Sequence, residues 1–225
     1  MSLRPVPRPA GLFEQVVAAL RAQITSGAWP VGSRIPTEPE LVSLLGVARN
    51  TVREAVRALA HNGLLDIRHG SGTYVAATSE LAGVMCRRFA ATPREDVVEA
   101  RGALEVAAAG MAARRRTEED LARLADLLRR RELAWESGER DAFVDADAAF
   151  HLAVVAASHS EVLAGLYADL GEVIRRSLRE HFEAGLSQAA HMDHARLLEA
   201  IRAGDPDAAS AEAASHTAAA CAAAG

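Results

Sequence analysis

Apolar and polar side chains alternate with the period of an α-helix along most of this 225-residue chain. Residues 11–26 carry an apolar residue at every fourth position, so that one face of a helix can be buried: Leu12, Val16, Leu20 and Ile24. A helical spacing returns at 37–45 and 49–62, with the turn Gly46-Val47-Ala48 between them. Residues 64–67 and 73–75 are predicted to form two short strands around a glycine-containing turn. The pattern therefore predicts three helices followed by a β-hairpin.

The remainder of the chain, from residue 93, has helical spacing and lacks the alternation typical of a strand. Thr92-Pro93 and Thr117 are suitable helix starts, and Gly138 and Gly204 are suitable breaks. Six helices are predicted, at 93–115, 118–136, 140–157, 160–184, 188–203 and 206–223. The fold class is therefore expected to be mainly α, with an N-terminal domain at 1–76, a linker at 77–92 and an antiparallel helical bundle at 93–225.

The segment from Pro36 to Val75 has the features of a winged helix-turn-helix. Thr37 with Glu40 three positions later is a capping-box pattern, and Gly46 can end the helix that follows. The next helix concentrates its polar side chains in the first turn and a half: Arg49, Asn50, Thr51 and Arg53. Arginine can bind guanine and asparagine can bind adenine when the start of such a helix enters a major groove.

The predicted hairpin has the composition of a DNA-binding wing. Arg68 and His69 supply donors near its tip, and Gly70 allows close approach to a sugar-phosphate backbone. The segment is therefore predicted to bind double-stranded DNA. A helix-turn-helix that docks another protein is the alternative.

The net charge of −5 is unevenly distributed. Residues 1–76 hold eight arginines and five acidic residues, whereas the rest of the chain holds seventeen arginines and twenty-five acidic residues. A basic N-terminal part followed by an acidic remainder is expected when only the N-terminal part contacts nucleic acid. The sequence has no lysine, which excludes Schiff-base and pyridoxal phosphate chemistry.

The two cysteines, Cys86 and Cys221, have neither metal nor redox spacing and are compatible with a reducing compartment. No apolar stretch reaches the length of a membrane span, and the first residues lack the apolar core of a signal peptide. A cytoplasmic protein without membrane contact is therefore expected.

Two polar residues lie on the predicted inward face of the bundle. Asp147 and His151 are four positions apart on one helix, among apolar residues that must turn toward the core. His194 shares a helix face with leucines and isoleucine, and His216 lies in the alanine-rich last helix. Three imidazoles and one carboxylate suit Zn²⁺ or a similar divalent ion, and a hydrogen-bonded core pair of Asp147 and His151 is the alternative.

Four motifs resemble the DNA-binding domain of the GntR family of bacterial transcription regulators: Pro36-Thr37-Glu38, Val47-Ala48-Arg49, Val52-Arg53-Glu54-Ala55 and Gly70-Ser71-Gly72-Thr73. The resemblance implies main base and phosphate contacts by Arg49 and Arg53, accessory contacts by Asn50 and Thr51, and wing contacts by His69 and Gly70. This chain has Pro39 where the family commonly has arginine, and Ala48 where it has serine or threonine. One backbone contact and one helix cap are therefore expected to be missing.

Three segments in the second half resemble the FCD effector domain of the FadR branch: Asp147 to His151, His194 to Asp205, and Ser215-His216. In metal-binding members these positions coordinate the ion, which implies Asp147, His151, His194 and His216 as ligands. Zinc is the first expectation, with nickel or manganese as alternatives. The segment Val98 to Glu105 is similar to the start of the first FCD helix, in which an inward arginine often binds the carboxylate of the effector. Arg101 is therefore the candidate, with a structural ion pair to Glu105 as the alternative.

These features together predict a ligand-responsive transcription regulator, expected to be a repressor, that binds a palindromic operator as a homodimer. Its effector would be a small organic acid, and no catalytic residue is assigned because the chain is not expected to be an enzyme. A metal sensor, in which the ion itself is the signal, is one alternative, and a metalloenzyme is another. The remaining histidines are expected to be surface or local hydrogen-bonding groups: His61, His159, His181 and His191.

Overall fold

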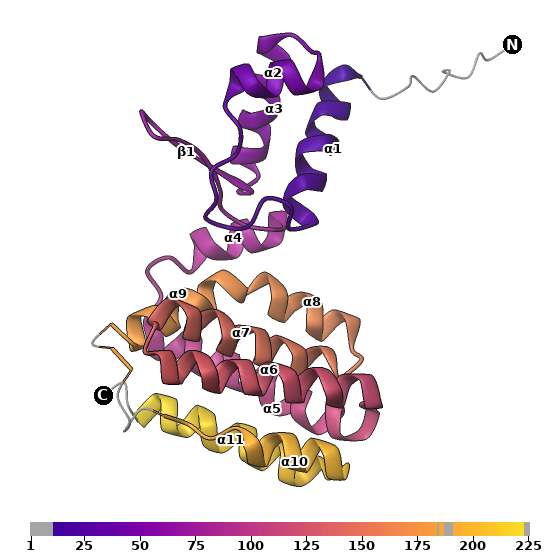
Figure 1. Cartoon of the computed structure of the whole chain (residues 1–225), viewed down its shortest axis with the longest axis vertical. Helices are drawn as coiled ribbons and strands as arrows, with labels where there is room; N and C mark the ends of the chain where they lie inside the picture. The colour runs from indigo at the N-terminus through magenta and orange to yellow at the C-terminus, as the bar shows by residue number, and fades with distance from the viewer. Residues whose placement is uncertain (1–10, 184, 187–190, 223–225) are drawn as a thin grey trace, which may run out of the picture. The chain divides into compact units, whose positions relative to one another are not determined.

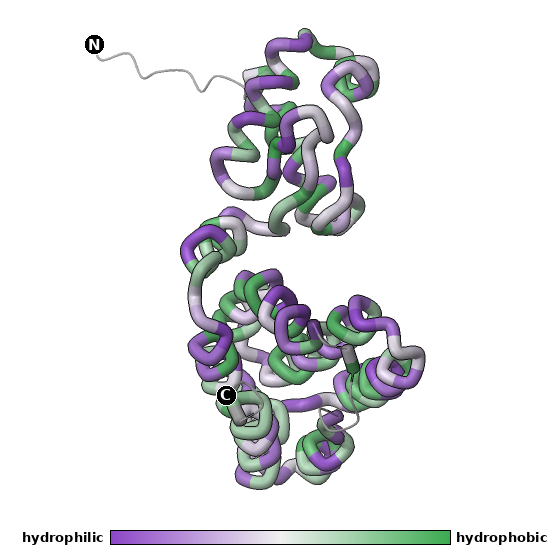
Figure 2. The backbone as a smooth tube through the Cα atoms, turned by 90° about the vertical axis from the view of Figure 1, so that its left-hand side faces the viewer, coloured by the Kyte–Doolittle hydropathy of each residue, from purple (hydrophilic) through white to green (hydrophobic). Residues whose placement is uncertain are grey.

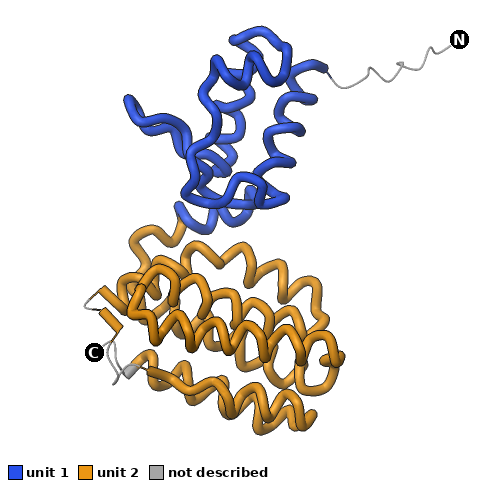
Figure 3. Tube along the Cα trace, viewed as in Figure 1, with its two compact units in different colours: residues 1–87 blue, residues 88–225 orange. Residues whose placement is uncertain are grey.

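The computed structural model describes residues 11–183, 185–186 and 191–222. The chain divides into two compact units, an N-terminal unit of residues 1–87 and a C-terminal unit of residues 88–225, which Figure 3 colours separately. Hydrophobic and hydrophilic residues alternate along the helices of both units (Figure 2), as expected when each helix buries one face. No helix in the described part of the chain is both long and apolar enough to cross a membrane.

The N-terminal unit consists of helices and one antiparallel hairpin (Figure 1). Its elements are α1 Leu12–Thr25, α2 Glu38–Leu45, α3 Arg49–His61, β1 Leu65–Arg68, β2 Gly72–Val75 and α4 Glu80–Arg88. In the hairpin Leu65 lies opposite Val75, and Arg68 lies opposite Gly72. Helices α1 and α2 both pack against α3. The three predicted helices and the hairpin are confirmed, and α4 lies within the range predicted as a linker.

Local sequence signals explain the geometry of the helix-turn-helix. The Thr37 backbone N–H donates to Glu40 Oε2 over 2.7 Å, which confirms the predicted capping box. Gly46 ends α2 in the left-handed conformation, with φ at 65°, as the turn requires. Gly83 of α4 approaches the end of α3 so closely that a Cβ atom there would lie 2.5 Å from the Gly63 carbonyl oxygen.

The C-terminal unit is a bundle of helices in which α5 is central, because it packs against α7, α8, α9, α10 and α11 (Figure 1). Its helices are α5 Arg94–Arg115, α6 Glu118–Ser137, α7 Arg140–Ala156, α8 Glu161–Asp169, α9 Gly171–His181, α10 Ala195–Ala203 and α11 Pro206–Ala222. The predicted fold class is therefore correct for both units.

Two predicted helices differ from the structure. The one predicted at 160–184 is divided at Leu170 and Gly171 into α8 and α9, where glycine weakens the helix. The one predicted at 188–203 begins only at Ala195, because His194 has non-helical dihedral angles and caps α10. The ends predicted at 184, at 188–190 and at 223 lie outside the described residues. Pro93 caps α5 instead of starting it.

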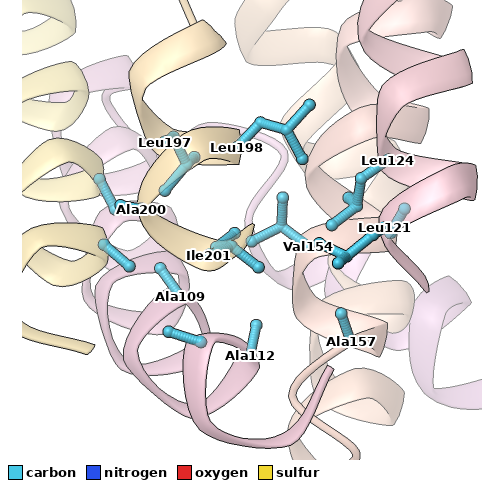
Figure 4. Packing of buried hydrophobic residues seen from close by; sticks show 14 of the residues in the cluster. Ala109, Ala112, Leu121, Leu124, Val154, Ala157, Leu197, Leu198, Ala200 and Ile201 are labelled. Carbon is cyan, nitrogen blue, oxygen red and sulfur yellow. The ribbon is translucent and has the colours of Figure 1, made fainter. Parts of the chain in front are cut away.

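Small side chains bring α5 and α11 close together. The main core contains many alanines, among them Ala109 and Ala112, packed against leucines and Ile201 (Figure 4). A Cβ atom on Gly102 would lie 2.3 Å from the Thr217 side chain, so only glycine fits this helix contact. The close packing brings Arg101 on α5 and His216 on α11 to one cavity.

Candidate metal centre and nucleic-acid interface

The exposed face of α3 presents the predicted DNA-contacting residues. Asn50 is exposed, and the Arg49 and Arg53 side chains are 64% and 37% exposed. Glu38 at the start of α2 accepts hydrogen bonds at 3.4 Å from Nε of both arginines. Burial and hydrogen bonding act in opposite directions on this carboxyl, and the two arginines hold its pKa below the usual value. Glu38 therefore orients both guanidinium groups before any nucleic acid binds.

The wing is basic and exposed at its tip. Arg68 Nε donates to Asp66 Oδ2 over 2.8 Å, and the guanidinium lies 4.3 Å from the centre of the Tyr74 ring. His69 and Gly70 are exposed, and Gly70 has a φ of 76°, which favours glycine. The backbone at the tip is thus accessible, and Arg68 is held along the side of the wing.

Three of the four predicted metal ligands form a compact buried cluster in the C-terminal unit. Asp147 and His151 project from α7, and His194 precedes α10. Each offers one ligand atom, and these atoms all lie within 4.8 Å of one another. The three residues are between 0% and 4% exposed. A hydrophilic cluster with so little solvent contact needs internal partners or an ion.

Hydrogen bonds fix the tautomers of two of these imidazoles. His194 Nδ1 lies 2.9 Å from the Met192 carbonyl oxygen, so Nδ1 must carry the proton and donate. His151 Nδ1 lies 3.1 Å from Glu105 Oε1 and donates to it in the same way. The two Nε2 atoms face each other at 3.1 Å, and each presents a lone pair whenever its ring carries a proton on Nδ1 alone.

This spacing fits a shared cation. Two nitrogen ligands at about 2.0–2.1 Å from a tetrahedral zinc ion lie roughly 3.3 Å apart. Without a cation or an added proton, two lone pairs at 3.1 Å would repel each other. The outer partners Glu105 and Met192 are of the kind that orient metal-binding histidines.

His216 extends the cluster, although it lies outside the compact set of three. Its ring centre is 4.2 Å from that of His194, and its Nε2 donates to the Asp193 carbonyl oxygen at 3.1 Å. Its Nδ1 is buried and has no hydrogen-bond partner among the described residues. Burial lowers the pKa of His216 and, more strongly, that of His194, so both rings favour the neutral, ligand-competent form. A buried acceptor without a protein partner is suited to bind an ion or a water molecule.

Two arginines surround the carboxylate of the cluster. Arg131 Nε donates to Asp147 Oδ1 over 2.8 Å, and an Arg101 Nη atom lies 3.3 Å from Oδ2. Burial favours the neutral acid, but the charges of His151 and the two arginines hold the pKa of Asp147 far below its usual value. Asp147 is therefore ionised at neutral pH and can bind a cation.

Glu105 organises the other side of the cluster. It accepts hydrogen bonds from Arg101 Nε at 2.6 Å and from the Tyr167 hydroxyl at 2.5 Å, and it also orients His151. Burial opposes its ionisation, yet Arg101 and His151 hold its pKa far below the usual value. Burial, together with the same contact with Glu105, raises the pKa of the Tyr167 hydroxyl. Tyr167 therefore remains a neutral donor.

A cavity opens beside this cluster. Its walls include Arg101, Glu105, Arg131, His216 and the three residues of the compact cluster. The volume open to the centres of water-sized molecules is about 50 Å³. An ordered water needs about 10–15 Å³ on this measure, so the cavity can hold several waters or a slender organic molecule.

Comparison with known proteins gives one consistent result. Residues 96–219 match the FCD domain, and residues 12–75 match the gntR family of bacterial regulatory proteins. The chain is 33% identical over 196 residues to the HTH-type transcriptional regulator LutR of Bacillus subtilis (strain 168), covering 81% of this chain and 87% of LutR. The chain belongs to the GntR family.

Other members of the family resemble it over similar lengths. The galactonate operon transcriptional repressor of Escherichia coli (strain K12) is 30% identical to this GntR protein over 207 residues, covering 87% of this chain and 89% of the repressor. The structure of Streptococcus agalactiae GntR is similar with a TM-score of 0.52 and 28% identity, covering 92% of this chain and 98% of that one. These relatives are transcription regulators and not enzymes, as the sequence predicted.

Two side chains at this site of the GntR protein were not predicted from the sequence, and a third was predicted in a different environment. Arg131 lies at an inward position, seven residues after Leu124 and four before Trp135, so helical spacing could have revealed it. Tyr167 carried no comparable signal. His181, expected at the surface or in a local hydrogen bond, instead lines the cavity and contacts Arg94.

Proposed function

We propose that this protein is a repressor whose affinity for DNA is controlled by a small organic acid bound at a divalent metal in the C-terminal unit. The observation that carries the proposal is the convergence of Asp147 with the bare nitrogens of His151 and His194 in one buried cavity. The names of relatives support an organic acid, since they refer to galactonate and L-lactate dehydrogenase operons.

Zinc is the expected ion, with nickel or manganese as alternatives, and His216 is the expected fourth ligand. Around the centre, the guanidinium groups of Arg101 and Arg131 face the carboxylates of Glu105 and Asp147. These four charges balance, so a divalent ion would make the centre positive. The loaded centre would therefore attract a carboxylate, and the remaining N–H groups of Arg101 are suited to bind it.

The N-terminal unit would bind a palindromic operator as part of a homodimer. Arg49 and Arg53 would make the main contacts in the major groove, with Asn50 and Thr51 beside them. The wing would contact the backbone through three residues: Arg68, His69 and Gly70. Two N-terminal units held at a fixed separation would bind two half-sites of the operator. An effector that favours a different separation could lower operator affinity by about 5- to 150-fold, the usual range for a coupling of about 1–3 kcal/mol.

The first experiment measures the metal content of the purified protein and of His194→Ala by mass spectrometry. His159→Asn is the matched control, because His159 is an exposed histidine of the same unit and its φ of 47° is tolerated by asparagine. One ion per chain is expected in the wild type and the control, and much less in His194→Ala. Operator binding is then measured by fluorescence anisotropy with and without chelator. An ion-free wild type that still responds to an acid would exclude the metal from the mechanism.

A metal sensor is the second candidate. It is favoured by the engagement of Arg101 with Glu105 at 2.6 Å and with Asp147 at 3.3 Å, which gives this arginine a structural role. The two candidates differ in what changes DNA affinity. A sensor responds to zinc in the absence of any acid, whereas the proposed repressor responds to an acid at constant, saturating zinc.

A further inference from the structure

The cavity extends along α5 from Arg101 toward the first residue of that helix. The residues of α5 that line it include Arg94, Val97, Val98, Arg101 and Glu105. An α-helix rises about 1.5 Å per residue, so the Cα atoms of Arg94 and Arg101 lie roughly 10 Å apart along the axis. The cavity therefore has a central end at the metal-ligand cluster and a distal end at Arg94.

The distal end offers donors and a positive charge. Arg94 Nη1 donates to His181 Nδ1 over 3.1 Å, so the His181 proton lies on Nε2 and is available to another acceptor. Burial and the charge of Arg94 lower the pKa of His181, which keeps the ring neutral. Among the described residues no ion pair joins Arg94 to a carboxylate, whereas Arg101 and Arg131 each bind carboxylates. Of the three arginines that line the cavity, Arg94 is therefore the one whose charge is not paired with a carboxylate among the described residues.

The walls between the two ends are mainly apolar. Val97 and Val98 of α5 face the cavity together with Ile174, Leu178 and Phe182. The volume of about 50 Å³ limits the ligand to a small molecule, and an unbranched chain spans the roughly 10 Å between the two ends with the fewest atoms. A methylene chain would bury its surface here without leaving a polar group unpaired.

We propose that Arg94 and His181 form a second anion-binding subsite, and that the effector is an unbranched dicarboxylate with one carboxylate at each end of the cavity. The inference rests on the proposed function for the first carboxylate, at the metal and Arg101. A guanidinium can bind the second carboxylate through two parallel hydrogen bonds, and His181 Nε2–H adds a third donor. A monocarboxylate would leave Arg94 without a counter-charge.

Isothermal titration calorimetry on the zinc-loaded full chain tests the subsite. Succinate, glutarate and adipate are each compared with the monocarboxylate of equal carbon number: butyrate, pentanoate and hexanoate. For at least one pair, we expect the dicarboxylate to bind about tenfold more tightly or better. Arg94→Gln should abolish this preference and leave the monocarboxylate affinity unchanged, and Arg94→Lys should retain part of the preference. Arg114→Gln, the same charge change at an exposed position of α5, is the matched control.

The outcomes separate this inference from the proposed function. If the wild type binds the monocarboxylates and shows no preference in any pair, the second subsite is wrong and the acid-binding function stands. If Arg94→Gln weakens both members of a pair equally, Arg94 supports the cavity without recognising a second carboxylate, which also overturns the subsite. If no acid binds the wild type, both proposals fail. The thermal unfolding midpoint of each variant shows whether a loss of binding reflects a loss of fold.

Discussion

Arg131 allows a direct test of whether the charges around Asp147 stabilise the C-terminal unit. The Arg131 and Asp147 side chains are only 1% and 5% exposed, and their atoms approach to 2.8 Å. Arg131→Met removes the charge and preserves much of the side-chain length that packs against the Phe143 ring. The Asp147 carboxylate would then lose its shortest partner and keep Arg101 at 3.3 Å. Removing one partner of a buried ion pair costs about 3–5 kcal/mol, and we expect a loss near the lower end because Arg101 remains.

Arg129→Met is the matched control. Arg129 precedes Arg131 by two positions on α6, its side chain is 64% exposed, and it pairs with Asp126 on the surface. Exposed pairs contribute about 0–1 kcal/mol, so the control should change the free energy of unfolding little. Urea unfolding is followed by tryptophan fluorescence in a Trp29→Phe background. The signal then comes from Trp135, whose ring centre lies 5.0 Å from that of Phe143. It therefore reports on the C-terminal unit alone.

The measurement is made first in chelator and then with saturating zinc. In chelator the loss caused by Arg131→Met should exceed that caused by Arg129→Met by about 2–4 kcal/mol. In zinc the loss should shrink, because an ion bound to Asp147 replaces the missing positive charge. Equal losses for the two variants in chelator would refute the claim that the buried ion pair is a stability element.

Three further predictions concern packing, hydrogen bonding and pH. Gly83→Ala should destabilise the N-terminal unit by about 1–3 kcal/mol in urea unfolding, because the new Cβ meets the Gly63 carbonyl oxygen; an unchanged midpoint would contradict this. Tyr167→Phe should cost about 1.5–3 kcal/mol by the same assay, because Glu105 loses a buried donor, and a cost below 0.5 kcal/mol would argue against that bond. In chelator, the free energy of unfolding should fall as the pH drops below about 6.5. Burial depresses the pKa of His194, so the unfolded chain binds a proton in this range that the folded chain does not. A free energy of unfolding that stays constant between about pH 7 and pH 5 would refute this.

The N-terminal unit could be predicted from sequence because its signals are local. The capping box of Thr37 and Glu40 and the glycine at Gly46 each act over a few residues. The unit's helices needed only the spacing of residues such as Val52 and Leu59, both of which are fully buried. The sequence did not reveal that Glu38 binds two arginines of the next helix, because that contact depends on the angle at the turn.

The buried cluster of Asp147, His151 and His194 was only partly predictable, for a different physical reason. Asp147 and His151 lie on one helix, so their four-residue spacing fixes their proximity. Arg131 reaches the same carboxylate from α6, and its partner depends on how α6 and α7 align along their length. That alignment follows from packing across the whole interface, which no short motif specifies. His194 lies at the end of a non-helical segment, which explains why the predicted helix began too early.

The balance of charge links the two kinds of ligand proposed for this cavity. Without an ion, the two guanidinium groups and two carboxylates around the cluster balance in charge, and the bare nitrogens of His151 and His194 favour a cation. With a divalent ion bound, the centre would become positive, and an anion would be the favoured second ligand. Each proposed ligand would therefore strengthen the binding of the other by the same factor, since coupling between two sites is reciprocal. The main contribution of the proposed metal would be to give an acidic helical unit a site at which an acid can bind.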